Sequence, residues 1–147
     1  GQSFGSVAGI ILIVAAGGGF KQTLVDSGIG DVIANSITES AMNPLIAGWL
    51  VAVLIRLATG SATVATVTAS GIMVPLATGM NPTHLALLVL AIGAGSVFFS
   101  HLNDAGFWLV KEYFGMTVGQ TLKTWSLMET ILSVVGLGCV MLLSLVL

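Results

Sequence analysis

The feature that most constrains this chain is a long stretch without charge, residues 57–103, which contains no Asp, Glu, Lys or Arg. Residues 3–20 and 130–147 are also uncharged. A helix that spans a bilayer needs about 20 mostly apolar residues, because the hydrocarbon layer is about 30 Å thick. Three such regions in a chain of 147 residues predict an all-α integral membrane protein, which we treat as a single membrane domain over residues 1–147.

The composition excludes two other classes of protein. Only 7% of the residues are charged and 56% are apolar, whereas disordered segments are polar and highly charged. Four Lys and Arg residues cannot form the basic surface that nucleic-acid binding needs, so we expect no nucleic-acid partner. The single cysteine, Cys139, has no partner for an intrachain disulfide, and we interpret it as an apolar packing residue.

The pattern of apolar and polar residues divides the membrane domain into five segments. We expect a first span at residues 3–19, an interfacial helix at 21–38, a re-entrant helical hairpin at 44–78, a broken span at 83–114 and a last span at 126–147. The hairpin is predicted because two apolar stretches, each too short to cross a bilayer, flank a polar tip at residues 59–63. Non-helical backbone persists at membrane depth only where it lines a cavity or is buried in protein.

The basic residues predict the orientation in the membrane. Lys111 and Lys123 are two of the four cations, and cytoplasmic loops carry an excess of Lys and Arg. We therefore place the connection 111–125 in the cytoplasm. The last span, which the chain enters through Glu129, then leaves the C-terminus on the outer side.

Arg56 is the first candidate for a binding residue, because it lies inside an apolar stretch just before the hairpin tip. A cation at such a place is costly unless it is paired or lines a cavity. A guanidinium can bind a carboxylate through two hydrogen bonds, so we expect Arg56 to recognise an anionic substrate. The alternatives are a structural ion pair with Asp104 or Glu112, or a side chain that extends to the membrane interface.

The hairpin tip supplies further candidates, namely Gly60, Ser61 and Thr63. Hydroxyl groups that face a cavity can hydrogen-bond a polyhydroxylated solute, and the N-termini of half-helices favour anions. If the backbone is helical, the spacing places four hydroxyl-bearing residues on one face: Thr59, Thr63, Thr66 and Ser70. The alternative is that these small residues are ordinary packing material of membrane helices.

A polar cluster interrupts the broken span at residues 100–104 and contains His101, Asn103 and Asp104. An intramembrane carboxylate is a functional candidate, and a nearby imidazole titrates close to physiological pH. We expect His101 and Asp104 to bind and release a proton. The alternative is that Asp104 balances Arg56 permanently and that His101 is a satisfied donor in the core. We expect no metal site, because the His and Cys residues lie on separate segments.

The sequence contains no Walker A motif, no G-x-S-x-G elbow and no H-E-x-x-H motif. We therefore expect a protein that is not an enzyme and needs no cofactor, with an intramembrane enzyme as a remote alternative. A channel would need a continuous polar stripe through several spans, which the residues outside 56–70 and 100–104 do not provide. A structural membrane subunit would explain the glycine-rich packing but would leave Arg56 and Asp104 unexplained.

Three stretches of the chain resemble the gluconate:proton symporters, or gluconate permeases. They are RLATGSATVATVTASGIMVPLA (56–77), GSVFFSHLNDAGFWLVKEYFG (95–115) and WSLMETILSVVGLGCVMLLSLVL (125–147). The resemblance covers nearly the whole chain and corresponds to the C-terminal third of that family. It implies uptake of gluconate or a related sugar acid with protons across the bacterial inner membrane. The outer side, on which the basic residues place the C-terminus, would then be the periplasm.

More distantly, the layout resembles the ion-transporter superfamily, in which a hairpin with a Ser-Asn-Thr tip precedes a helix broken at a Pro-containing turn. Here Ser61-Ala62-Thr63 occupies the tip, and the break carries no Pro. In those relatives the tip Asn helps to hold sodium, so its absence, together with His101 and Asp104, implies coupling to H⁺ instead of Na⁺. The resemblance also implies a second half, supplied by the remainder of the transporter chain or by a second copy in a homodimer.

Taken together, the residues and the resemblance predict a solute site between the hairpin tip and the break. Arg56 would bind the carboxylate, while Gly60, Ser61, Thr63 and Asn103 would complete the substrate site. The expected partners are a small anionic sugar acid and the lipid bilayer. The alternatives are a transporter for another organic anion of the same superfamily, or a channel or structural membrane subunit.

Overall fold

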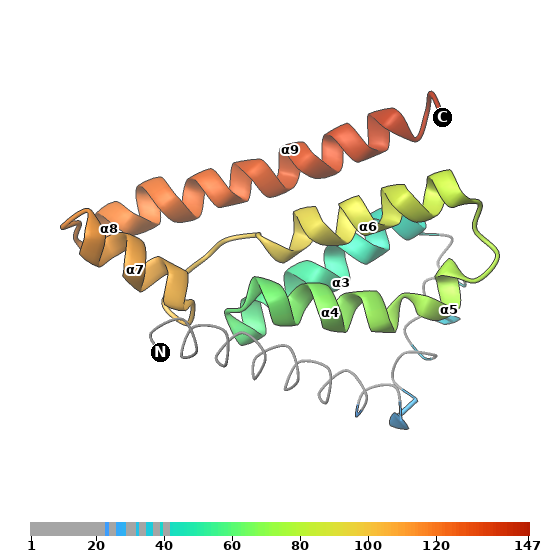
Figure 1. The fold of residues 1–147 in the computed structure, drawn as a ribbon, viewed down its shortest axis with the longest axis horizontal. Helices are drawn as coiled ribbons and strands as arrows, with labels where there is room; N and C mark the ends of the chain where they lie inside the picture. The colour runs from blue at the N-terminus through green and yellow to red at the C-terminus, as the bar shows by residue number, and fades with distance from the viewer. Residues whose placement is uncertain (1–22, 24–25, 29–31, 33–34, 37–38, 40–41) are drawn as a thin grey trace, which may run out of the picture.

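The computed structural model describes residues 23, 26–28, 32, 35–36, 39 and 42–147. Within these residues the regular elements are helical (Figure 1), which agrees with the predicted all-α class. The helices are α3 (Pro44–Thr59), α4 (Ala62–Ile72), α5 (Val74–Ala77), α6 (Pro82–Ser96), α7 (Ala105–Tyr113), α8 (Val118–Thr121), the π-helix η1 (Leu122–Ser126) and α9 (Leu127–Leu143). The expected span at 3–19 and most of the expected interfacial helix at 21–38 lie outside the described residues.

Helices α3 and α4 form a hairpin whose ends are set by local sequence signals. The Asn43 side chain accepts a hydrogen bond from the Leu45 amide at 2.8 Å, and a proline follows it at the first helical position, where the missing N–H costs nothing. Helix α3 ends at Thr59 and is capped by Gly60, whose φ of 68° lies in the left-handed region that glycine adopts without a steric penalty. The Ser61 hydroxyl then caps α4 by accepting from the Val64 amide at 3.3 Å.

The non-helical tip is therefore shorter than the sequence indicated, because only Gly60 and Ser61 separate the two arms. Thr59 belongs to α3, whereas Thr63, Thr66 and Ser70 belong to α4. The backbone is not one continuous helix from Thr59 to Ser70, so the condition for a single face of four hydroxyls is not met, because helical spacing relates residues only within one helix.

The polar break separates α6 from α7. Helix α6 begins at an Asn-Pro pair, where Asn81 accepts from the His84 amide at 2.8 Å. Residues 97–104 are non-helical, so the break is longer than the polar cluster at 100–104. Asp104 caps the next helix by accepting from the Gly106 amide at 2.8 Å, which places a carboxylate directly at the point where helix α7 starts.

The expected loop at 111–125 is wrong over most of its length. Helix α7 continues to Tyr113, and a capping box between Thr117 and Gln120 starts the next helix at Val118. The helix continues through the π-helical turn and α9 to Leu143, and it is the one helix in the described part of the chain that is long and apolar enough to cross a membrane. Helices α3, α4 and α6 are shorter apolar helices.

Helix α6 lies between α3 and α9, and small residues allow the close approach (Figure 1). A Cβ atom on Gly95 would lie 2.4 Å from the Trp49 carbonyl oxygen, and one on Gly48 would lie 2.7 Å from a Leu88 methyl group. Such contacts between small residues are typical of membrane helix pairs. The Trp49 indole also donates to the buried Ser133 hydroxyl at 3.0 Å, which ties α3 to α9.

The arrangement brings chain segments that are distant in sequence to one end of the bundle. The end of α3, the start of α4, the start of α7 and the first turns of the last helix all lie at this end (Figure 1). The starts of α3 and α6 and the end of α9 lie at the opposite end. The hairpin tip and the break are thereby placed against each other.

Candidate functional site

A cavity of about 560 Å³ lies where the hairpin tip meets the break. It is lined by Arg56, Thr59, Gly60, Ser61, Ala62, Thr63, Val64, Asn103, Asp104, Ala105, Gly106, Trp125 and Glu129. The structure therefore brings together the predicted substrate-site residues and Asp104, but it does not include His101 in this lining. We refer to it as the tip cavity.

Backbone contacts hold the hairpin tip against the break. A Cβ atom on Gly60 would lie only 2.2 Å from the Asn103 carbonyl oxygen, so no larger residue fits there. The Asn103 side chain donates through Nδ2 to the Leu57 carbonyl at 2.9 Å. Two of the segments that line the tip cavity, the hairpin tip and the break, are thus directly in contact.

Arg56 is buried, with 3% of its surface exposed. Its Nη1 donates to the Gly60 carbonyl at 2.6 Å, while Nη2 lies 2.5 Å from Asp104 Oδ2 and 3.5 Å from Glu129 Oε2. The pairing with Asp104 considered from the sequence is formed. The pairing with Glu112 is not, since that carboxylate binds Lys111 at 2.6 Å. The Arg56 Nε is a buried donor without a hydrogen-bond partner in the described part of the protein.

Asp104 is held by donors on both of its oxygens. Oδ1 accepts from the Gly106 amide, and Oδ2 accepts from Arg56 and from the Ser100 hydroxyl. Ser100 is itself fully buried and receives the Trp125 indole N–H at 3.1 Å. Because an indole nitrogen can only donate, the Ser100 oxygen accepts there and its single hydrogen is available for Asp104.

Glu129 was not among the residues predicted for the site. The sequence interpretation placed it at the entrance of a span starting at 126, whereas the helix starts at Val118, so that Glu129 lies within it and lines the tip cavity. It is the only acidic residue between 118 and 143. An acidic residue within an apolar helix indicates a functional site. The sequence did not show this for Glu129, because the predicted span began at 126 and placed Glu129 at its entrance.

His101 has a different environment from the one expected. Its Nδ1 lies 3.0 Å from the Phe99 carbonyl oxygen, and its ring centroid lies 5.5 Å from that of the Phe99 side chain. These contacts are local to the break. The His101 backbone carbonyl also accepts from the Asp104 amide at 2.9 Å, but the ring contacts Phe99. A proton role for the His101 ring remains a prediction.

The electrostatics of the tip cavity follow from one guanidinium and two carboxylates, Arg56, Asp104 and Glu129. If all three are ionised, the cluster carries a net negative charge. The starts of α4 and α7 also face this cavity, since their caps Ser61 and Asp104 line it, and helix N-termini favour anions. Among the described residues, no group of three His, Cys, Asp or Glu side chains could hold a metal ion.

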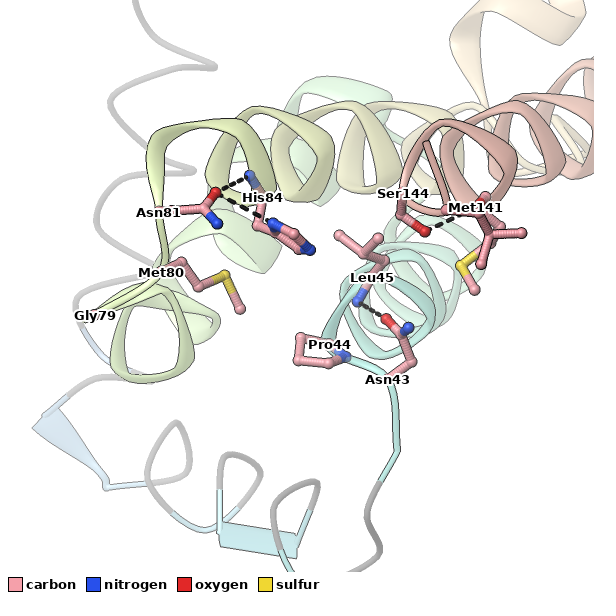
Figure 2. Close-up of a pocket in the computed structure, with 10 residues that line it drawn as sticks. Asn43, Pro44, Leu45, Gly79, Met80, Asn81, His84, Met141 and Ser144 are labelled. Atoms are coloured by element: carbon pink, nitrogen blue, oxygen red, sulfur yellow. Dashed lines mark hydrogen bonds between the residues drawn. The ribbon is translucent and has the colours of Figure 1, made fainter. Parts of the chain in front are cut away.

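A second cavity of about 570 Å³ lies at the opposite end of the bundle (Figure 2). Its polar side chains are occupied locally. Asn43 binds the Leu45 amide, and Asn81 binds both the amide and the ring nitrogen Nδ1 of His84, at 2.8 and 3.1 Å. These are helix caps, and they offer no carboxylate or buried cation comparable with the tip cavity.

Comparison with known proteins gives close relatives. The chain is 58% identical to a gluconate permease of Pseudomonas aeruginosa over 99% of its own length and 32% of the relative. It is 53% identical to the Gnt-II system L-idonate transporter of Escherichia coli, covering 93% of the chain and 31% of the relative. It is 51% identical to a gluconate permease of Bacillus subtilis, covering 93% of the chain and 30% of the relative.

The chain thus spans about a third of the length of the curated relatives that it matches. No solved structure matches it. The family model described as GntP family permease matches residues 1–146. A permease is a membrane transport protein and not an enzyme. The chain belongs to the GntP permease family.

Proposed function

We propose that the residues lining the tip cavity form the substrate site of a proton-coupled transporter, which takes up gluconate or a related sugar acid across the bacterial inner membrane. The similar proteins named gluconate permease and L-idonate transporter support this class of solute. Because the chain spans about a third of those relatives, the activity is that of an intact permease. The rest of that permease, or a second copy in a homodimer, would complete the site.

The observation that carries the proposal is the buried Arg56 in the lining of the tip cavity, which also receives the starts of helices α4 and α7. Discontinuous helices whose N-termini point at a mid-membrane site are a recurring way to bind anionic solutes. The carboxylate of a sugar acid would bind near Arg56. Its hydroxyl groups would hydrogen-bond the tip residues Ser61 and Thr63 and the side chain of Asn103.

The coupling ion in this proposal is a proton, because the cavity combines a cation with two carboxylates, which can bind and release H⁺. The sequence points to His101 and Asp104 as the proton carriers. We retain Asp104 as part of the charge cluster that governs proton binding. We also propose that the C-terminus is periplasmic, on the strength of Lys111 and Lys123.

The test is uptake of labelled gluconate by the intact permease reconstituted in liposomes. With an inward proton gradient, the proposal predicts accumulation above the external concentration that collapses when a protonophore is added. Unlabelled L-idonate should compete, whereas neutral glucose should not, because it lacks the carboxylate that Arg56 would bind. Correctly inserted protein that moves no sugar acid would contradict the proposal.

A further inference from the structure

We propose that Glu129 carries the coupled proton. Its protonation would free the edge of the Arg56 guanidinium formed by Nε and Nη2 to bind the carboxylate of the substrate. This inference rests on the proposed function and assigns the proton to a residue other than His101 and Asp104. It follows from a comparison of the two carboxylates that contact Arg56.

The two carboxylates differ in how well their charges are satisfied. Asp104 accepts hydrogen bonds from the Gly106 amide, Arg56 and the Ser100 hydroxyl. Glu129 has only a long contact of 3.5 Å to Arg56 and one backbone donor, the Ser100 amide. Hydrogen bonds to a carboxylate favour its charged form. Asp104 is therefore held as an anion, and Glu129 is the carboxylate that can accept a proton with little loss of bonding.

The Ser100 hydroxyl reinforces this division of roles. Its oxygen receives the Trp125 indole hydrogen, so its own hydrogen points to Asp104. A proton on the same Asp104 oxygen would compete with that hydrogen and with the Arg56 hydrogen bond. No comparable arrangement surrounds Glu129 in the described part of the chain.

Charge balance then links proton binding to anion binding. Among the described residues, the charged groups that face Glu129 are Arg56 from α3 and Asp104 from the start of α7. Arg56 and Asp104 neutralise each other, so an ionised Glu129 leaves the cavity negative and repels an anionic solute at short range. Protonation of Glu129 removes this repulsion. By linkage, the proton and the anion each increase the affinity for the other.

The guanidinium of Arg56 supplies the donors that the substrate carboxylate can bind when Glu129 is protonated. The Nε–H of an arginine lies on the same edge as one hydrogen of Nη2, and this edge can bind a carboxylate through two hydrogen bonds. In Arg56 the Nε is buried and unpartnered in the described residues, while Nη2 makes the long contact to Glu129. When Glu129 is protonated, a substrate carboxylate can take both donors, while Nη1 remains on Gly60 and Asp104 keeps its own contact.

The decisive variant is Glu129→Gln in the intact permease, assayed in liposomes. Because a glutamine side chain imitates the protonated acid, exchange of internal for external gluconate should continue, whereas accumulation driven by a proton gradient should fall to simple equilibration. Gluconate affinity should weaken as the pH rises in the wild type but stay constant in the variant. The matched control is Glu112→Gln, which changes an exposed carboxylate paired with Lys111 and should accumulate gluconate normally.

The outcomes separate this inference from the proposed function. If Glu129→Gln accumulates gluconate with the pH dependence of the wild type, the inference is overturned while gluconate symport stands. Loss of both exchange and accumulation in Glu129→Gln also overturns it, because Glu129 then serves substrate binding or folding. If the wild type and the Glu112→Gln control accumulate nothing, the proposed function itself has failed.

A measurement on the wild-type permease does not require that any variant folds correctly. A hydrophobic carbodiimide reacts with protonated carboxyl groups in apolar surroundings, and mass spectrometry locates the modified residue. The proposal predicts modification at Glu129 that declines as the pH rises and is slowed by gluconate. Modification at Asp104 in place of Glu129, or at neither residue, would contradict it.

Discussion

At the scale of single residues, the site depends on one buried cation shared between three acceptors. Arg56 binds the Gly60 carbonyl and two carboxylates, Asp104 and Glu129, from different helices. A buried ion pair contributes little net stability, but removal of one partner leaves an uncompensated charge and costs about 3–5 kcal/mol. The functional and structural roles of Arg56 must therefore be separated by experiment.

Replacement of Arg56 should abolish sugar-acid uptake. Arg56→Gln leaves two carboxylates without their cation, so we also expect lower thermal stability. The double variant Arg56→Gln with Asp104→Asn removes one charge of each sign and should recover much of that stability. It should still take up no gluconate in liposomes, because the carboxylate has lost its donor. Recovery of uptake in the double variant would mean that Arg56 serves only to pair Asp104.

Replacement of Asp104 should weaken uptake by disturbing Arg56. Asp104→Asn can still cap α7, since Asn and Asp are similarly good caps, but it loses a charge-assisted hydrogen bond worth about 1.5–3 kcal/mol. We expect proton-driven gluconate uptake to fall by at least about tenfold, the lower end of that range. Unchanged accumulation with an unchanged pH dependence would remove Asp104 from the site.

At the scale of secondary-structure elements, the contact between hairpin tip and break is the central feature. Local sequence signals determine where the arms begin and end, because Asn43-Pro44 and Gly60 act through their own backbone geometry. The sequence did not predict a helix start at Val118, because the capping box of Thr117 and Gln120 lies within the stretch 111–125 that was predicted to be a connection. The sequence alone could not show that Glu129 reaches Arg56, since that contact joins helices that are distant along the chain.

The tip contact can be tested through its glycine. Gly60→Ala would place a Cβ atom 2.2 Å from the Asn103 carbonyl oxygen and would also strain the left-handed backbone at φ 68°, by about 1–2 kcal/mol. We expect the purified permease to unfold at a lower temperature and uptake to be lost. Gly115→Ala is a matched control, because its φ of 61° gives similar strain but nothing lies within 4 Å. Equal effects of the two variants would show that the tip contact contributes nothing.

At the scale of the whole molecule, the charge-free stretches predicted the all-α membrane class, and family membership agrees with it. These stretches are a property of composition along the chain, which is why they can be read without a structure. The cavity is a property of tertiary placement. The structure brings the predicted tip residues, Arg56 and Asp104 together, leaves His101 outside and adds Glu129, while the role of each residue stays a prediction.

The most direct test of the central claim is the number of protons that the purified intact permease takes up when it binds gluconate. Titration calorimetry in buffers of different ionisation enthalpy measures this number. If the anion and the proton share the cluster around Arg56, about one proton should be bound per gluconate at neutral pH, as linkage requires. Gluconate that binds with no proton uptake, at any pH at which the protein is folded, would contradict the account.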